Sequence, residues 1–264
     1  MTGSAVSLLR KAVVVVALPA LLFAAWWFLS ASSTSIYAPP LSDIVVQLDR
    51  VWVEDGRFTT DVLPSVARLA AGYGLAVAIG VTLGVALGAS RTARQVLEPL
   101  LEFFRAVPAP VLIPVLILLA GVDTTQKVLV IASGAVWPVL LNTVEGVRAT
   151  DETLSDTCRS YGITGWSRLR HLVLRSASPQ IVTGMRQALS IAVILMVISE
   201  MFASDNGIGN AVLEFQRSFA IPEMWSGILV LGLLGVTLAL LFRVFENRTL
   251  AWYYGLRRAQ RDGS

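Results

Sequence analysis

The sequence predicts an all-α, polytopic membrane protein with about six transmembrane helices. Of its 264 residues, 55% are hydrophobic and only 15% are charged, and the mean hydropathy is +0.69. A water-soluble domain of this length would struggle to cover so much apolar surface with polar groups. Five segments contain no charged residue, and a sixth contains only Arg186 and Glu200: residues 12–29, 69–90, 106–122, 128–144, 224–242 and 179–204.

Each of these segments is roughly long enough to cross a hydrocarbon core about 30 Å thick. A soluble helical protein is the alternative, because one or two such segments can be buried core helices, but six argue against it. We therefore predict one membrane domain over residues 1–264.

The first apolar segment, residues 12–29, has two interpretations. Arg10 and Lys11 precede it and small residues follow it, as in a cleaved signal peptide. Its apolar part is longer than the usual core of such a peptide, about 7–15 residues. Trp26 and Trp27 near its far end suit an anchor at the membrane interface. We predict a retained helix.

The segment that follows predicts a short interfacial helix. Pro39 and Pro40 end the preceding stretch, and Leu41, Ile44 and Leu48 then repeat at helical spacing. In the second span, glycines recur every four residues, at positions 80, 84 and 88. Such a seam lets two helix backbones approach closely in lipid, so we expect it to pack against another helix.

Prolines mark the third and fourth spans. An amphipathic segment, residues 91–108, follows the second span on the side expected to be inner; Pro108, Pro110 and Pro114 then interrupt the third span, and Pro138 the fourth. Proline removes an amide donor and kinks a helix, which membranes tolerate only where neighbours or a cavity satisfy the freed carbonyl. Kinked helices around a cavity suit a transport path, although structural spans also contain proline kinks.

Arginine predicts the orientation. If both termini are cytoplasmic, the inner segments hold fifteen of the 21 basic residues: Arg10, Lys11, Arg91, Arg94, Arg105, Arg148, Arg159, Arg168, Arg170, Arg175, Arg243, Arg248, Arg257, Arg258 and Arg261. The positive-inside rule then favours this topology. Nucleic-acid binding is the weaker interpretation, because these arginines are scattered over separate segments without a reader motif.

The inner loop, residues 146–178, predicts two short helices joined at a glycine. Asp151 can cap the first helix, and Leu154, Cys158 and Tyr161 share one of its faces. Gly162 can stop that helix because it adopts positive φ without a clash. A second helix is expected to start near Thr164. A solvated connector is the plain alternative, but an apolar face without a span of its own needs a protein partner.

The spacing in this loop resembles the signature of permease subunits of bacterial ABC importers: Glu-Ala-Ala, three residues, Gly, nine residues, then aliphatic-x-Leu-Pro. Gly162 and Leu174 match in register, whereas Asp156, Thr157 and Cys158 replace Glu-Ala-Ala, and Arg175 replaces the proline. Downstream, three residues fit the group of aliphatic sulfonate, taurine and nitrate permeases: Pro179, Gly184 and Arg186.

The resemblance implies the fold of a type I ABC importer permease in the bacterial inner membrane. It implies that the inner loop docks on a cytoplasmic ATPase subunit, with the contacts carried by Leu154, Asp156, Thr157, Cys158, Tyr161 and Gly162. ATP and Mg²⁺ would be bound by that partner, because this sequence has no phosphate-binding Gly-x-x-x-x-Gly-Lys-Ser/Thr loop. A second permease copy and an external solute-binding protein are the other implied partners, and a small anion such as a sulfonate, taurine or nitrate is the implied cargo.

The polar residues of the spans are the candidates for a translocation path: Asn142, Arg186, Ser190, Ser199 and Glu200. Arg186 and Glu200 lie fourteen residues apart, about 21 Å along a helix, so they cannot pair with each other. Arg186 is expected to extend its charge to the inner interface. Glu200, near the outer end, either braces the following loop or lines the external mouth.

Two other classes of function remain open. A secondary transporter or channel would need carboxylates or histidines in mid-span, and only Glu200 comes near. An intramembrane enzyme would need a nucleophile with its base, or metal ligands, at membrane depth. The one histidine, His171, lies in the inner loop, and the one cysteine, Cys158, can form no intramolecular disulfide. We therefore predict no catalytic residue and no metal site.

Overall fold

The computed structural model describes residues 17–202 and 204–262, and the regular elements within these ranges are all helical. The chain divides into two compact units. The larger unit comprises residues 60–210 and 231–264, and the smaller one residues 1–59 and 211–230. Each unit is described by itself.

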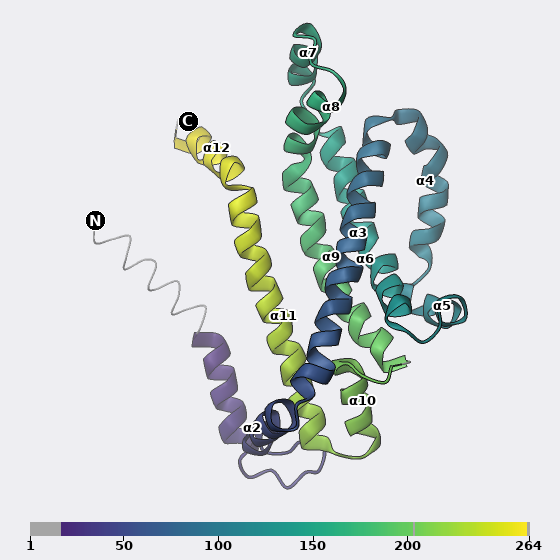
Figure 1. The fold of residues 1–264 in the computed structure, drawn as a ribbon. Helices are drawn as coiled ribbons and strands as arrows, with labels where there is room; N and C mark the ends of the chain where they lie inside the picture. Colours follow the sequence, from purple (N-terminus) through teal and green to yellow (C-terminus); the bar gives the residue numbers. More distant parts are fainter. Residues whose placement is uncertain (1–16, 203, 263–264) are drawn as a thin grey trace. The chain divides into compact units, whose positions relative to one another are not determined.

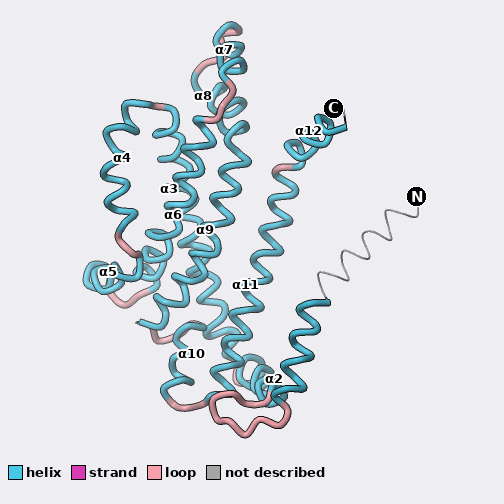
Figure 2. Tube along the Cα trace, turned by 180° about the vertical axis from the view of Figure 1, so that it is seen from behind, coloured by secondary structure: helices cyan, strands magenta, loops and turns pink. Residues whose placement is uncertain are grey.

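The larger unit contains most of the long helices (Figure 1). In chain order, its elements are α3 (Leu63–Ala89), α4 (Arg91–Ala106), the 3₁₀ turn η3 (Ala109–Leu112), α5 (Ile113–Ala120), α6 (Thr124–Arg148), α7 (Glu152–Ser160), α8 (Gly165–Arg168), the π-helical turn η4 (Leu169–Val173) and α9 (Leu174–Phe202). The later part of α11 (Ile221–Thr249) and α12 (Ala251–Asp262) complete it. Helices α3, α6 and α9 lie side by side in both ribbon views (Figures 1 and 2), and their apolar side chains form the main core.

Four helices of the described chain are long and apolar enough to cross a membrane: Phe58–Ala89, Thr124–Arg148, Gly165–Phe202 and Ile221–Thr249. A fifth span results if Arg91–Ala106 and Ala109–Ala120, which are bent by 82° at their junction, count as one broken span. The expected first span begins outside the described residues, and its described part, Ala17–Ser30, is a shorter apolar helix. The prediction of a polytopic helical membrane protein is confirmed.

The glycine seam packs α3 against α6, as predicted. A β-carbon built on Gly84 would lie 2.5 Å from Cβ of Thr143, and one on Gly80 would lie 2.7 Å from Cβ of Val139. Gly88 meets Val147 in the same way, and the seam continues to Gly72, which the sequence pattern did not single out. Side chains essentially never approach so closely, so glycine is required for this helix spacing.

The prolines behave differently from one another. Pro138, predicted to interrupt the fourth span, lies inside an α6 that runs on unbroken, next to the core residue Val139. Pro108 lies at the break between α4 and η3, and Pro110 stands in the first turn of η3. Pro114 stands in the first turn of α5, where the missing amide donor is not needed. Tertiary packing therefore decides which proline ends a helix.

Segment 91–108 contains the helix α4 (Arg91–Ala106), which ends just before Pro108, in keeping with the predicted amphipathic stretch closed by prolines. Helix α4 runs antiparallel to α3 from the turn at Ser90 (Figure 1), and it is bent by 82° against the helical segment Ala109–Ala120. Arg105 thus lies about 21 Å along α4 from Arg91. Only the beginning of this helix lies at the α3–α4 turn.

The smaller unit contains α2 (Leu41–Asp49), the π-helical turn η1 (Arg50–Glu54), most of α10 (Ile208–Arg217) and the first part of α11. A second π-helical turn, η2 (Phe58–Val62), leads into α3. Helix α2 begins directly after Pro40, as the sequence predicted. The indole of Trp52 donates a hydrogen bond to Ser226 Oγ at 2.9 Å, and the indole of Trp225 donates to the carbonyl of Tyr37 at 3.1 Å.

Candidate functional site

The loop between α6 and α9 begins with a capped helix. The carboxylate of Asp151 accepts a hydrogen bond from the amide of Leu154 at 3.1 Å, which satisfies one of the free donors at the start of α7. Glu152 adds a negative charge to the first turn, where the helix dipole favours it. The cap that the sequence predicted at Asp151 is therefore present.

Gly162 ends α7 in a Schellman turn. Its φ is +65°, the left-handed region in which a side chain costs energy. The amide of Ile163 donates to the carbonyl of Cys158 at 2.8 Å, and the amide of Gly162 donates to that of Arg159 at 3.1 Å. These two bonds satisfy carbonyls that the helix end would otherwise leave without partners.

The second helix of the loop continues into the membrane span. It starts after Thr164, as predicted, and α8, η4 and α9 follow one another without a gap, so that Gly165–Phe202 forms a single long helix. Arg168 donates to Ser155 Oγ at 2.8 Å and thereby joins α8 to α7. A displacement of α7 can therefore be passed on to α9 through a continuous helix.

The surface of this loop is unpartnered in the described chain. No residue of α7 is buried, and Tyr161 and Trp166 are 79% and 72% exposed, respectively. Leu154 and Ile163 add further exposed apolar area. The other predicted docking residues lie on the same short helix and its end: Asp156, Thr157 and Cys158, followed by Gly162. Figures 1 and 2 both show α7 beyond the turn that joins α3 to α4, with α8 at about the level of that turn.

The predicted path residues fall into three places. Asn142 lies in a cavity of about 560 Å³ that the break between α4 and η3 lines together with α6 and α9. Arg186 and Ser190 line a cavity of about 830 Å³ between α9 and the later part of α11. There, Arg186 forms an ion pair with Glu246, whose other oxygen accepts a hydrogen bond from Tyr254 at 2.9 Å. Ser199 and Glu200 are fully buried.

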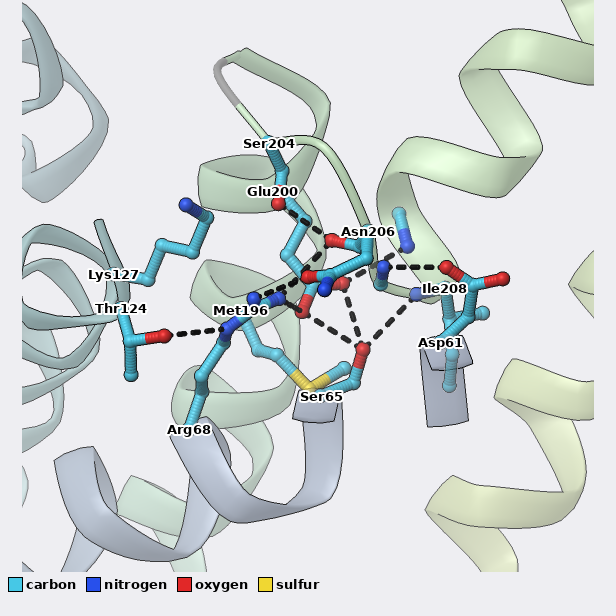
Figure 3. Close-up of polar contacts among 12 residues, drawn as sticks. Asp61, Ser65, Arg68, Thr124, Lys127, Met196, Glu200, Ser204, Asn206 and Ile208 are labelled. Atoms are coloured by element: carbon cyan, nitrogen blue, oxygen red, sulfur yellow. Dashed lines mark hydrogen bonds and ion pairs between the residues drawn. The ribbon is translucent and has the colours of Figure 1, made fainter. Parts of the chain in front are cut away.

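Glu200 is held by three groups from two separate segments (Figure 3). The guanidinium of Arg68 in α3 lies 2.9 Å from one carboxylate oxygen, the hydroxyl of Ser65 donates to both oxygens at 2.8 and 2.9 Å, and the amide of Gly209 donates at 3.0 Å. Of the two roles considered for Glu200, this geometry matches that of a brace for the loop that follows it.

The same cluster holds the loop itself. Arg68 also donates to the carbonyl of Asn206 at 3.1 Å and to its side-chain oxygen. The amide of Gly207 donates to Asp61 at 2.7 Å, and the amide of Ile208 donates to Ser65 at 3.0 Å. Every one of these bonds connects α3, or the turn before it, to residues 206–208 (Figure 3).

The sequence interpretation missed Arg68, Ser65 and Asp61. Arg68 lies at the edge of the second apolar segment, where a basic side chain normally only reaches the interface. The one signal in the sequence was that a carboxylate within an apolar span, Glu200, needs a positively charged partner. The sequence does not say which basic side chain is that partner. Lys127 was missed as well: it is 2% exposed, and its ammonium donates to the carbonyl of Val122 at 3.2 Å. No metal-binding group of three His, Cys, Asp or Glu residues occurs in the described part of the chain.

Comparisons with known proteins agree with this architecture. Residues 76–250 match the family described as "Binding-protein-dependent transport system inner membrane component". The chain is 28% identical over 238 residues to the putative aliphatic sulfonates transport permease protein SsuC of Bacillus subtilis, covering 89% of this chain and 86% of the relative. It is 25% identical over 240 residues to the taurine transport system permease protein TauC of Escherichia coli, covering 89% and 87% of the two chains.

A third relative is the bicarbonate transport system permease protein CmpB of Synechococcus elongatus, at 26% identity over 238 residues, covering 86% of this chain and 82% of the relative. Among solved structures, the inward-facing MetNI methionine ABC transporter shares the fold, with a TM-score of 0.62 at 16% identity over 72% of this chain and 94% of that one. The family match spans well over half of the sequence and includes the capped loop and the broken span. The chain therefore belongs to the family of binding-protein-dependent transport system inner membrane components, and it is a multi-pass permease subunit of an ABC importer.

Proposed function

We propose that this permease is driven from its α6–α9 loop by a cytoplasmic ABC ATPase. The observation that carries the proposal is a helix with no buried residue, α7, which is tied to a second helix that continues directly into α9. A pair of short helices with exposed apolar side chains needs a protein surface to cover them. The proposed contacts are those predicted from the sequence: Leu154, Asp156, Thr157, Cys158, Tyr161 and Gly162.

The chemistry of ATP belongs, in this proposal, to the partner, which would bind ATP and Mg²⁺. Closure of two nucleotide-bound ATPase subunits would move α7, and the continuous α8–η4–α9 helix would pass that movement to the core. The chain itself contributes no catalytic group and forms one half of the path. Two ATPase subunits require two docking loops, which favours a homodimeric permease.

The proposed orientation places both termini in the cytoplasm of a bacterial cell, with the chain in the inner membrane. Under this topology the loop contains four of the arginines on the inner side, Arg159, Arg168, Arg170 and Arg175. The positive-inside rule supports the assignment. The outer side would then receive solute from an external solute-binding protein.

We propose a small anion as the cargo, because the relatives carry the names of aliphatic sulfonate, taurine and bicarbonate permeases. The path would pass the two cavities that contain the predicted residues Asn142, Arg186 and Ser190. Glu200 is assigned instead to the brace of the 204–209 loop, because it is buried and accepts a hydrogen bond from Gly209. Ser199 is also buried and donates to the carbonyl of Met196 within α9, so it is left out of the proposed path.

The test is reconstitution of the complete transporter. The tagged permease would be co-expressed with the ATPase and the solute-binding protein of its own host, purified, and inserted into liposomes. We expect the ATPase to co-purify, and its ATP hydrolysis to rise when the loaded binding protein is present. An ATPase that fails to co-purify with the intact permease, or uptake that proceeds without ATP, would overturn the proposal.

A further inference from the structure

The cavity at the break of the third span is built from backbone that a membrane does not otherwise tolerate. Helix α4 ends at Ala106, Val107 and Pro108 form the break, and the segment Ala109–Ala120 follows at 82° to α4. Val107, Pro108, Ala109 and Pro110 all line the cavity. Non-helical backbone at membrane depth is stable only when it is buried in protein or lines a space that holds water. Broken spans of this kind mark the solute sites of many transporters.

The opposite walls come from α6 and α9. Trp137 and Leu141 of α6 and Ile191 of α9 contribute apolar and aromatic surface. Asn142 and Gln187 add the two amide groups, which lie 3.4 Å apart (Nδ2 to Oε1). The volume of about 560 Å³ lies within the range of small-molecule sites, about 300–1,000 Å³.

Arg105 is the one charged side chain among the described residues that line this cavity. No carboxylate shares the lining with it, so the cavity carries a net positive charge on a largely apolar surface. The amide nitrogen of Asn142 donates to the Pro138 carbonyl at 2.8 Å and faces Gln187 Oε1, which leaves the amide nitrogen of Gln187 to donate to a solute. A guanidinium binds carboxylate and similar oxyanions through two parallel hydrogen bonds. A cationic solute would meet only repulsion there.

Arg105 already has one partner, Glu102, which lies one helical turn earlier at 2.6 Å. Both side chains are about half exposed, 48% and 53%. Where the cavity holds water, such a pair is weak because the water screens it. Glu102 itself does not line the cavity. An incoming anion can therefore replace Glu102 at the guanidinium.

We infer that this cavity is the solute site of the path, and that Arg105 selects small organic anions with a sulfonate or carboxylate group and a short apolar body. The inference rests on the proposed transport function and deepens it, because it names the residue and the cargo class. In the occupied cavity, the amides of Asn142 and Gln187 and the ring of Trp137 would face the rest of the solute.

Charge selection in the cavity can be measured without transport. In the full-length chain with Cys158→Ser, the substitution Gln187→Cys places one thiol in the cavity wall. The probes are 2-sulfonatoethyl methanethiosulfonate and its trimethylammonium analogue, which have similar sizes and opposite charges. We expect the sulfonate reagent to label the thiol at position 187 faster than the cationic reagent, because Arg105 attracts the anion. Arg105→Gln should lower the ratio of the anionic to the cationic labelling rate by about fivefold.

Three controls keep the result specific. Arg105→Lys retains the charge and should keep most of the ratio, which also covers the case in which the glutamine variant folds poorly. Glu102→Gln removes the exposed partner and should leave the ratio unchanged or raise it. In a chain that keeps Cys158 and lacks Gln187→Cys, the ratio of the two labelling rates at Cys158 should not change when Arg105 is replaced. A thiol at position 187 that neither reagent labels, or a ratio that Arg105→Gln does not change, would overturn the inference.

Measurement of solute uptake distinguishes a failure of the proposed anion site from a failure of the proposed transport function. In proteoliposomes with the ATPase and binding protein, Arg105→Gln should lower the ATP-dependent uptake of ethanesulfonate by at least about tenfold, whereas Glu102→Gln should stay within about twofold. Unchanged uptake in Arg105→Gln, or uptake of only neutral solutes by the natural chain, would reject the site. If the labelling ratio depends on Arg105 but no solute enters with ATP, the proposed function fails and the anion-selective cavity stands.

Discussion

Arg68 of α3 and Glu200 of α9 form a buried ion pair between residues 132 positions apart, with 2.9 Å between Nη1 and Oε1. The carboxylate is inaccessible, and the guanidinium side chain is 7% exposed. The pair also holds the loop 204–209, because Arg68 donates to Asn206 and Glu200 accepts from Gly209. It therefore joins two spans and one loop at a single point.

Removal of one partner of this pair should destabilise the bundle strongly. Arg68→Gln leaves the carboxylate of Glu200 buried without its cation, a change that typically costs about 3–5 kcal/mol. The measurement is thermal or denaturant unfolding in detergent. The double variant Arg68→Gln, Glu200→Gln should recover part of the loss, because no uncompensated charge remains.

The matched control is the exposed pair between Arg57 and Glu214, 3.0 Å apart. Glu214→Gln should cost less than about 1 kcal/mol, because solvent screens this pair. Equal losses for Arg68→Gln and Glu214→Gln would contradict the bracing role of the buried pair.

Gly207 should tolerate no side chain. Its φ is +117°, and a β-carbon built there would lie 2.4 Å from Cδ of Glu200. Gly207→Ala should therefore add an overpacking cost of about 1–3 kcal/mol to the backbone strain. Gly121→Ala is the control, because Gly121 also has positive φ, at +76°, but has open space around it. A larger loss at Gly121 would show that the contact with Glu200 matters little.

Replacing a glycine of α3 by alanine should be costly in the α3–α6 seam and harmless elsewhere in the helix. Gly84→Ala places a methyl group 2.5 Å from Cβ of Thr143, so we expect a loss of about 1–3 kcal/mol in unfolding free energy. Gly74, in the same helix, has nothing within 4 Å of the corresponding position. Gly74→Ala should be neutral or slightly stabilising, because alanine favours the helix by about 1 kcal/mol over glycine. The same loss at both sites would argue against a close-packed seam.

The backbone conformation at the end of α7 should control the coupling of ATP hydrolysis to solute uptake. Proline cannot adopt the φ of +65° found at Gly162, so Gly162→Pro should reduce ATP-dependent uptake to background while the permease still inserts into the membrane. Asparagine tolerates left-handed φ, so Gly162→Asn should retain most of the uptake. Normal uptake by the proline variant would reject the role of the Schellman turn in coupling.

The exposed ring of Tyr161 tests the docking surface separately from the turn. Tyr161→Asp puts a charge on a 79% exposed apolar surface, whereas Tyr161→Phe preserves the ring. We expect the aspartate variant to lose co-purification of the ATPase and the phenylalanine variant to keep it, with unfolding of the permease changed by less than about 0.5 kcal/mol in both. ATPase binding that survives in Tyr161→Asp would remove this residue from the interface.

The sequence by itself determined the features that depend on local order. Apolar length predicted the spans, glycine spacing predicted the face of α3 that meets α6, and Asp151 and Gly162 predicted both ends of α7. Each of these signals arises within a few turns of one helix, where residue spacing alone decides which side chains share a face.

Only the tertiary structure decided which distant groups meet. It paired Glu200 with Arg68, bent α4 by 82° against the helical segment that follows it, and placed Arg105 in a cavity with residues of α6 and α9. It also left Pro138 inside a continuous helix, whereas α4 ends just before Pro108. The physical reason is that a buried charge or a proline is stable only when neighbours from elsewhere in the chain satisfy it, and helical periodicity does not encode which neighbours those are.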